Sequence, residues 1–375
     1  MPIQTYTVSY STDNVTYTAL TNVQNISVSI GRKAQLDQYN ASTAQVSLRY
    51  PSGYASPIAA LVTGTFIKIV NTTSGKNTLL GVINNVSARY GIPYVGSVGN
   101  ADFLDLSIEC SFARLGRAQG GGYAMAANVL AGQLVVGSSQ SGVPMIYTLA
   151  SSPAMAATTI SGTWGDWLNR CLMGTNSRMI DAITSGILVL SPFAVTTSAV
   201  NFSDTTNNAT NQVYDEINFE SLADNFYTQV TVTPESFAAS TVLKAGATKP
   251  YRTLQTNTFN ASVSQGLDFA NYLLGNYGTS RFSIGSISCM AEAQNSFKLD
   301  QIGAGASSGA SHIVGASVSV AFRGTSYPCV VEGVSITATP AGSRYTYYLS
   351  GADLNAYLLL GKATYGRLDY NKLGF

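Results

Sequence analysis

Charge is the scarcest feature of this 375-residue sequence. Lys and Arg number 20, Asp and Glu 19, and charged residues make up 10% of the chain, against about 25% in an average globular protein. The net charge of +1 provides no electrostatic footprint for nucleic acid. The single His excludes His-rich metal sites and mechanisms that need two histidines. Because a net charge near zero promotes association, we expect partner subunits to cover much of the surface.

Cysteine is also rare, and no targeting or membrane segment is evident. No two of the four cysteines lie within four residues of each other, which excludes a C-x-x-C zinc or redox motif. Their apolar surroundings predict buried free thiols, although a disulfide between two of them stays open. We expect no signal peptide and no membrane span, because there is no basic and apolar leader and no run of about 18 apolar residues. These features predict synthesis in a reducing cytoplasm. The cysteines are Cys110, Cys171, Cys289 and Cys329.

Most of the chain alternates between apolar and polar residues. The clearest examples are residues 26–30, 44–50, 104–110 and 316–322. This period of two predicts antiparallel strands that are buried on one face, and the turn residues Ser11–Asn14 predict a hairpin. Strands that follow one another without intervening helices favour a β-barrel or sandwich over a parallel sheet. The predicted fold class is therefore mainly β with a few short helices.

Three short helices are predicted. Thr163 and Asp166 form a potential capping box in front of the first helix. The second runs from Gln265 to Leu274 with Ser264 as its N-cap, and a third covers Ala352 to Leu360. The first helix places its large apolar residues on one face, which predicts a core position for them. These residues are Trp164, Trp167, Leu168, Cys171 and Leu172.

Two changes in composition divide the chain. A Gly-rich stretch at 116–122 and a polar loop at 203–212 predict a β-domain at 1–115, an α+β insert at 116–211 and a second β-domain at 212–350. Residues 351–375 follow as a tail.

The two β-domains also contain similar segments. Thr43–Pro51 resembles Tyr227–Pro234, and Leu80–Val86 resembles Glu332–Ile336 more weakly. Either chance or a true duplication can explain such short matches. A true duplication would place two copies of one small β-barrel in the chain.

No segment forms a convincing active site. Ser307 lies in a G-x-S-x-G match with His312 nearby, but the surrounding small residues lack the strand and helix that a nucleophile elbow needs and predict a flexible loop. Asp215 and Glu216 point to opposite faces of a strand, which favours a solvated strand edge. Trp164 and Trp167 could form a sugar platform, but their helical spacing favours a core position. We predict no enzyme, no cofactor and no metal site.

Several motifs resemble a known family. Gly31–Tyr39 (GRKAQLDQY) precedes a strand at 43–50, Gly64–Ile69 (GTFIKI) follows, and Gly81–Ile83 begins a strand that ends near Tyr90-Gly91. Together with the ending Tyr365–Phe375, this ordered set is similar to minor tail proteins of tailed bacteriophages.

The resemblance implies a baseplate or tail-tip hub protein with two tail-tube-like split β-barrels and a smaller insert. Such proteins assemble as trimers, so that three chains present six barrels to a sixfold tail tube and let DNA pass during ejection. The implied partners are other copies of the chain, the tail tube and distal tail proteins, the tape-measure protein, and tail fibres or other tip proteins. The implied location is the virion. Any lysin or receptor-binding activity would reside in another protein.

Two alternatives to a trimeric hub remain open. A distal tail protein would form a hexameric ring from one barrel per chain, and a receptor- or carbohydrate-binding tail protein would expose aromatic side chains. The tail of the chain is aromatic and apolar without a core pattern, which predicts docking on a neighbouring subunit unless it is a frayed terminus. The predicted docking residues are Tyr365, Leu368, Tyr370, Leu373 and Phe375.

Overall fold

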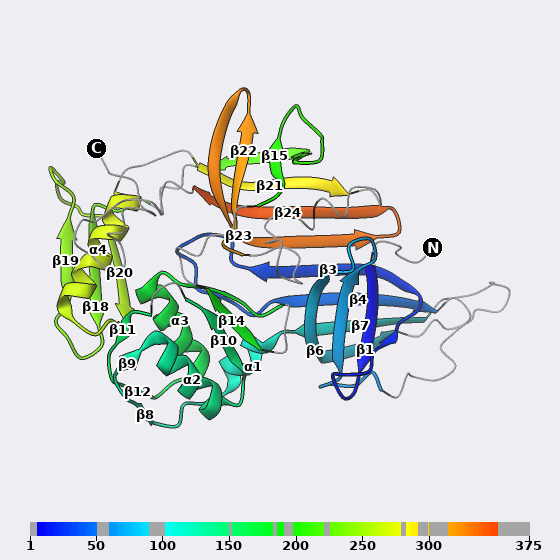
Figure 1. The fold of residues 1–375 in the computed structure, drawn as a ribbon, viewed down its shortest axis with the longest axis horizontal. Coiled ribbons are helices and arrows are strands. Elements are labelled where there is room, and N and C mark those ends of the chain that lie inside the picture. The colour runs from blue at the N-terminus through cyan, green and yellow to red at the C-terminus, as the bar shows by residue number, and fades with distance from the viewer. Residues whose placement is uncertain are drawn as a thin grey trace.

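The fold is mainly β, as predicted, with four helices in the part of the chain that the structure describes. The structure is a computed structural model (Figure 1). None of the helices in the described part is long and apolar enough to cross a membrane. The described residues are 6–50, 60–89, 102–149, 152–182, 186–190, 198–220, 226–278, 283–291, 299 and 314–351.

The N-terminal β-region forms one side of a 14-stranded sheet in the order β3-β4-β7-β6-β5-β1-β2. Strands β1 and β2 form the predicted hairpin. The predicted alternation is confirmed, because Ile26, Val28 and Ile30 are buried whereas their neighbours face outward. The long strand β6 pairs with β5 along its first half and with β7 along its second half. Strand β1, which pairs with β5, crosses β3 and β4 at a steep angle (Figure 1). The strands are β1 (Tyr6–Ser11), β2 (Thr18–Ala19), β3 (Val23–Gly31), β4 (Thr43–Tyr50), β5 (Phe66–Asn71), β6 (Asn77–Arg89) and β7 (Asp102–Glu109).

The C-terminal β-region continues the same sheet in the order β17-β21-β24-β23-β22-β15-β16. Strand β23 also pairs with β3, which joins the two regions edge to edge. Among the described residues the strand pairing does not close into a complete barrel. The strands are β15 (Asn201–Ser203), β16 (Asn211–Val213), β17 (Glu216–Glu220), β21 (Ser283–Ala291), β22 (Ser317–Phe322), β23 (Thr325–Thr339) and β24 (Gly342–Gly351).

A small α+β insert separates the two regions in sequence. The predicted capping box begins helix α3, where Thr163 Oγ1 accepts a hydrogen bond from Asp166 N at 3.1 Å. Trp164 and Trp167 are each 2% exposed, which confirms their core position. Helices α1 and α2 were not predicted, because neither has a side-chain cap and α2 is rich in Gly and Ser. The elements are α1 (Ser111–Arg117), β8 (Tyr123–Met125), β9 (Asn128–Val129), α2 (Leu130–Ser141), β10 (Met145–Thr148), β11 (Ala154–Met155), β12 (Thr158–Ile160), α3 (Trp164–Thr175), β13 (Arg178–Ile180) and β14 (Ile187–Leu190).

A second small unit lies between β17 and β21 in sequence. It contains β18 (Gln229–Pro234), β19 (Ser240–Leu243), β20 (Thr253–Thr258) and helix α4 (Val263–Tyr277), and it buries its own apolar cluster. The predicted N-cap was wrong by two residues. The helix begins at Val263, two residues before the predicted start, so Ser262 Oγ and not Ser264 accepts the capping bond from the Gln265 backbone.

One of the two sequence matches does not correspond to equivalent strands. Thr43–Tyr50 is β4 of the large sheet, whereas Gln229–Pro234 is β18 of the separate three-stranded sheet. The match was wrong as evidence of duplication, because short strands with alternating Val and Thr look alike in any sheet. The third predicted helix, Ala352–Leu360, lies outside the described residues.

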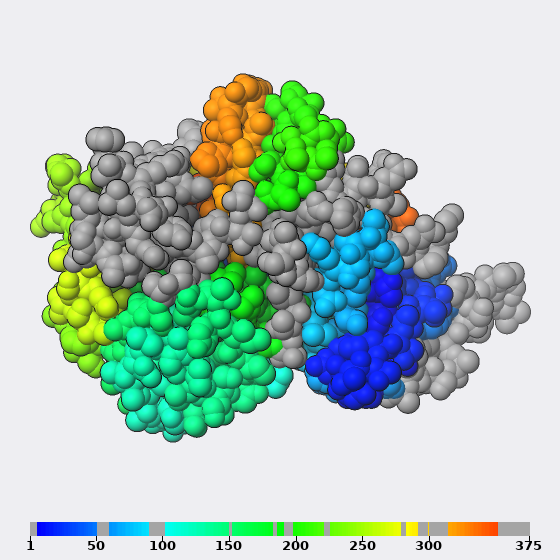
Figure 2. Space-filling model, viewed as in Figure 1, coloured from blue at the N-terminus to red at the C-terminus, as the bar shows by residue number. Residues whose placement is uncertain are grey.

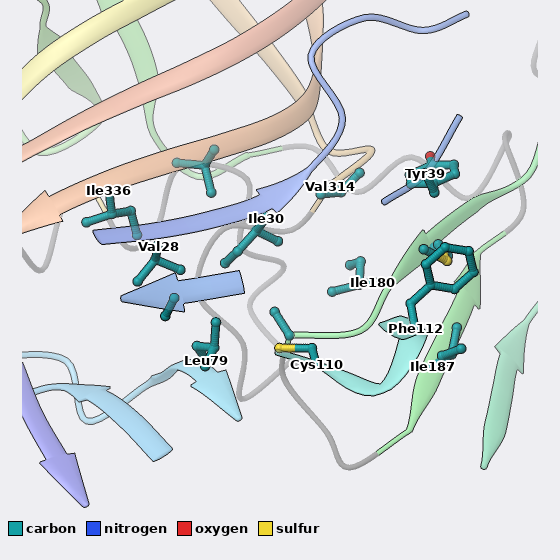
Figure 3. Packing of buried hydrophobic residues seen from close by; sticks show 14 of the residues in the cluster. Val28, Ile30, Tyr39, Leu79, Cys110, Phe112, Ile180, Ile187, Val314 and Ile336 are labelled. Carbon is teal, nitrogen blue, oxygen red and sulfur yellow. The ribbon is translucent and has the colours of Figure 1, made fainter. Parts of the chain in front are cut away.

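One continuous apolar core joins the large sheet to the insert. Ile336 lies beside Val28, Ile30 lies farther along β3 toward Val314, and Cys110, Phe112 and Ile180 extend the cluster toward the insert (Figure 3). All four cysteines are free and buried, as predicted. On the molecular surface the insert and the N-terminal region form separate lobes below a rim that contains β22 (Figure 2).

Candidate assembly site

The large sheet contains the same strand order twice. Strands β3-β4-β7-β6-β5-β1 correspond, in order of pairing and in order along the chain, to β17-β21-β24-β23-β22-β15. The only change of direction is in the last pair, which is antiparallel for β1 and β5 and parallel for β15 and β22. A β-irregularity also occurs at the same place in both copies, between Ile83 and Asn85 in β6 and between Val331 and Gly333 in β23. The sheet is therefore built from two topologically equivalent repeats.

The loop before β5 in the first repeat and the loop before β22 in the second repeat have the same backbone geometry. Gly64 and Gly315 have φ angles of +91° and +92°, a left-handed conformation that favours glycine. Gly64 N donates to Ile83 O at 2.8 Å, and Gly315 N donates to Val331 O at 2.6 Å. These bonds match Ile83 with Val331 and therefore Asn85 with Gly333. The weaker sequence match does lie on the equivalent strands β6 and β23, but it aligned Gly81 with Gly333 and was therefore out of register.

The two repeats meet along an antiparallel seam between β3 and β23. The pairing runs from Gly31 opposite Gly333 to Ile26 opposite Ala338. A Cβ atom on Gly31 would lie 2.4 Å from the Glu332 carbonyl oxygen, and one on Gly333 would lie 2.5 Å from the Arg32 carbonyl oxygen. The seam thus requires glycine on both strands at this point.

A buried ion cluster lies beside these glycines. Arg32 Nε donates to Glu332 Oε2 at 2.9 Å, and Arg178 Nη2 of β13 lies 3.6 Å from Glu332 Oε1. The Glu332, Arg32 and Arg178 side chains are 0%, 7% and 3% exposed. Burial alone would raise the pKa of Glu332, but the two guanidiniums outweigh burial and hold it below its usual value. The cluster therefore joins both repeats and the insert through one carboxylate.

Tyrosines of helix α4 extend this cluster to the second small unit. Tyr277 OH donates to Gln35 Oε1 at 2.6 Å, and Asn176 Nδ2 donates to Tyr272 OH at 2.7 Å. Burial raises the pKa of both tyrosines, which keeps them neutral. The loop after β3 is thereby hydrogen-bonded to α4.

Two strand edges that correspond to this seam have no strand beside them in the described part of the chain. Strand β17 is the counterpart of β3 and pairs only with β21. Residues 84–89 of β6 are the counterpart of the β23 segment at the seam and pair only with β7. Asp215 and Glu216 lie at the first of these edges, as predicted, and the Glu216 side chain is 68% exposed. Arg89 lies on the second edge and is 66% exposed.

The described residues contain no other arrangement with clear chemistry. No group of three or more His, Cys, Asp or Glu side chains that could hold a metal ion lies among them. A polar cleft of about 260 Å³ separates residues 37–39 from α3 and β20. Ser307, His312 and all five predicted docking residues lie outside the described residues.

The sequence predicted strand edges, but it did not reveal the ion cluster. The one available signal was a glutamate within the apolar run of β23, CVVEGV.

No family model and no curated protein matches the sequence. Solved structures do match the fold. A 43 kDa tail protein of prophage MuSo2 from Shewanella oneidensis has a TM-score of 0.64 at 11% identity, over 94% of this chain and 99% of that chain. A tail protein from Neisseria meningitidis MC58 has a TM-score of 0.65 at 11% identity, over 94% and 98%. This chain has the fold of phage tail proteins.

The same fold extends to a bacterial secretion system. An E. coli component of the type VI secretion system, described as similar in structure to the T4 bacteriophage tail proteins gp27 and gp5, has a TM-score of 0.53 at 10% identity. It matches over 92% of this chain and 75% of its own. The fold expected from the motif resemblance is thus confirmed, and the likeness to phage tail proteins spans both repeats and the insert.

Proposed function

We propose that this protein is a structural subunit of a phage tail that forms the hub ring at the tail tip or baseplate. The observation that carries the proposal is the repeated strand order within one continuous sheet. A chain with two repeats can form a threefold ring that presents six repeats to a sixfold tail tube, which a chain with one repeat achieves only as a hexamer. The second repeat favours the trimeric hub over the hexameric distal tail ring.

The predicted domains fit this proposal with one refinement. Domain 1–115 contains the first repeat, and the insert lies within 116–211. The second repeat begins at β15 (Asn201–Ser203), about ten residues before the boundary predicted at 212, and continues through 212–350. Residues 226–278 form a separate unit within the second of these domains, with their own sheet and buried cluster. Tail-tube and distal tail proteins would bind the two faces of the ring, and the insert and this unit would face other tip proteins.

The chemistry of the sheet supports passage of DNA through the ring. Thr337, Ser27, Gln45 and Ser107 are successive neighbours across four strands. Arg344 lies opposite Thr337 at one end of this row, but it binds Glu216 at 2.8 Å. The row therefore offers little cationic contact to phosphates, and such contacts supply most of non-specific DNA affinity. If this polar face lined the channel, DNA would slide past without being held.

A sugar- or receptor-binding role has less support. Both tryptophans of the chain are buried in the insert, where Trp164 and Trp167 pack edge to face with ring centroids 5.5 Å apart. They provide no exposed platform for a sugar ring.

The mass of the native assembly tests the hub proposal. For the purified full chain we expect a mass three times the 39.4 kDa of one chain, together with ring-shaped particles in electron micrographs. A hexamer would favour the distal tail ring, and a monomer at high concentration would refute both rings.

A further inference from the structure

The pairing of β3 with β23 inside the chain is a pattern that strands of two different copies can repeat. Strands β3 and β23 pair within one copy, whereas their counterparts, β17 and residues 84–89 of β6, have no strand partner among the described residues. We propose that β17 of one copy pairs antiparallel with the end of β6 of a second copy and so repeats the internal seam. This inference rests on the proposed ring and assigns the residues that connect its subunits.

The internal seam defines the register of the proposed contact. Ile26 of β3 lies opposite Val46 of β4. The counterpart of Val46 in the second repeat is Ile287 of β21, and Ile217 of β17 lies opposite Ile287. Ile217 therefore occupies the place of Ile26 in the second repeat. On the other strand, the matched irregularities make Ser87 the counterpart of Ser335.

The internal pairs then translate directly into pairs between copies. Ser29 opposite Ser335 becomes Glu220 opposite Ser87 of the next copy. The pair of Ser27 and Thr337 becomes Asn218 opposite Arg89.

This register produces complementary charges along the contact. Arg89 would lie diagonally between Glu216 and Glu220 of the other copy, at the 7–8 Å spacing that long side chains can span. Within one chain Arg89 already binds Asp105 at 3.0 Å, and Glu216 binds Arg344 at 2.8 Å. Association would join these two exposed pairs into one line of alternating charge. A second copy of this chain is therefore the occupant that fits both edges.

The contact between copies differs from the internal seam in one respect. Asn84 and Asn85 occupy the places of Glu332 and Gly333, so the buried carboxylate and the close glycine approach are absent at this position. Exposed charges must therefore contribute more to the contact between copies than to the internal seam. We expect added salt to weaken association between copies while the internal seam stays intact.

Engineered cysteines in the full chain test the register. Ser87→Cys with Glu220→Cys places two thiols directly opposite each other, at a Cα separation of about 4.5–5.5 Å that permits a disulfide. We expect mild oxidation to produce covalent oligomers up to the closed ring on non-reducing gels. The matched control, Ser87→Cys with Asn218→Cys, keeps Arg89, Glu216 and Glu220 and places the thiols diagonally, beyond disulfide reach. Ser29→Cys with Ser335→Cys serves as the internal control and should link within one chain without an increase in mass.

The outcomes separate this inference from the proposed function. A protein with trimeric mass that fails to cross-link at Ser87 and Glu220, or that links equally well in the diagonal control, would overturn the register but leave the hub standing. An unmodified protein that stays monomeric would refute the hub itself. Charge reversal by Arg89→Glu should raise the concentration needed for half-assembly several-fold, and an unchanged concentration would contradict the electrostatic part of the contact.

Discussion

Replacing Glu332 with Gln should strongly destabilise the fold. The substitution keeps the shape of the side chain and one acceptor oxygen for Arg32, so it removes charge and little volume. It leaves the Arg32 and Arg178 guanidiniums, 7% and 3% exposed, without a carboxylate between them. Breaking a buried ion pair by removing one partner costs about 3–5 kcal/mol, because the remaining charge cannot regain its hydration. Against a total stability of about 5–15 kcal/mol, this is a large loss.

Urea unfolding monitored by tryptophan fluorescence provides the assay. Trp164 and Trp167 are both buried in α3 and report on loss of the packed state. Protein concentration must be held constant, because association stabilises the folded chain by mass action. The control is Glu235→Gln, since the pair between Glu235 and Arg170 is about one-third exposed and should contribute at most about 1 kcal/mol.

The dependence on pH provides a second readout of the same cluster. Because the pKa of Glu332 is below the ordinary value of 4.5, its contribution to stability is present above that value and is lost as the pH falls through the lowered pKa. The difference between the wild type and Glu332→Gln should therefore shrink in acid. If Glu332→Gln unfolds within 1 kcal/mol of the wild type at neutral pH, the carboxylate does not hold the repeats together as we infer.

Four further perturbations have definite expected results. Gly333→Ala should destabilise the chain by about 1–3 kcal/mol in urea unfolding, because its Cβ would lie 2.5 Å from a backbone oxygen. Gly275→Ala should stabilise the chain by about 0.4–1 kcal/mol, because a Cβ at this position of helix α4 would meet open space. Burial raises the pKa of Asp181, whose carboxylate accepts bonds from two backbone N–H groups. Its contribution is therefore lost as the pH rises through the raised pKa, and the unfolding free energy of the wild type should fall relative to Asp181→Asn over that range; parallel pH profiles would contradict this. Deleting residues 365–375 should reduce the fraction of trimer in native mass spectra without shifting the unfolding midpoint at dilutions where the chain is monomeric, and unchanged assembly would exclude docking by Tyr365 and Phe375.

The strands were predictable because their signal is local. A sheet that is packed on one face imposes a period of two on the chain itself, and β3, β4 and β7 show this pattern without reference to any distant residue. The capping box of α3 is equally local, since Thr163 and Asp166 are three residues apart. Helices α1 and α2 have no comparable signal, because packing against the insert core stabilises them and their propensity does not.

The seam and its ion cluster were not predictable for the opposite reason. Arg32 and Glu332 are 300 residues apart, and only the pairing of β3 with β23 brings them together. The repeat of the strand order was also hidden at the level of sequence. The repeats share strand order, a β-irregularity and a left-handed glycine, and these features constrain the backbone and leave most side chains free to differ.

The internal seam also bears on whether the assembly closes. A contact between two different edges, repeated from copy to copy, gives a ring only when its rotation closes and otherwise gives a filament. One contact of this kind, the pairing of β3 with β23, is already formed within each chain. Gly31, Gly333 and the ion cluster at Glu332 hold it in one geometry. A contact between copies that repeats the same strand pairing would relate neighbouring repeats by nearly the same rotation as the internal seam. Six repeats would then follow one another around a trimer, joined alternately by the internal seam and by the contact between copies. In the proposed contact, the few charges at the two edges would lie diagonally beside their complements, Arg89 of one copy between Glu216 and Glu220 of the next.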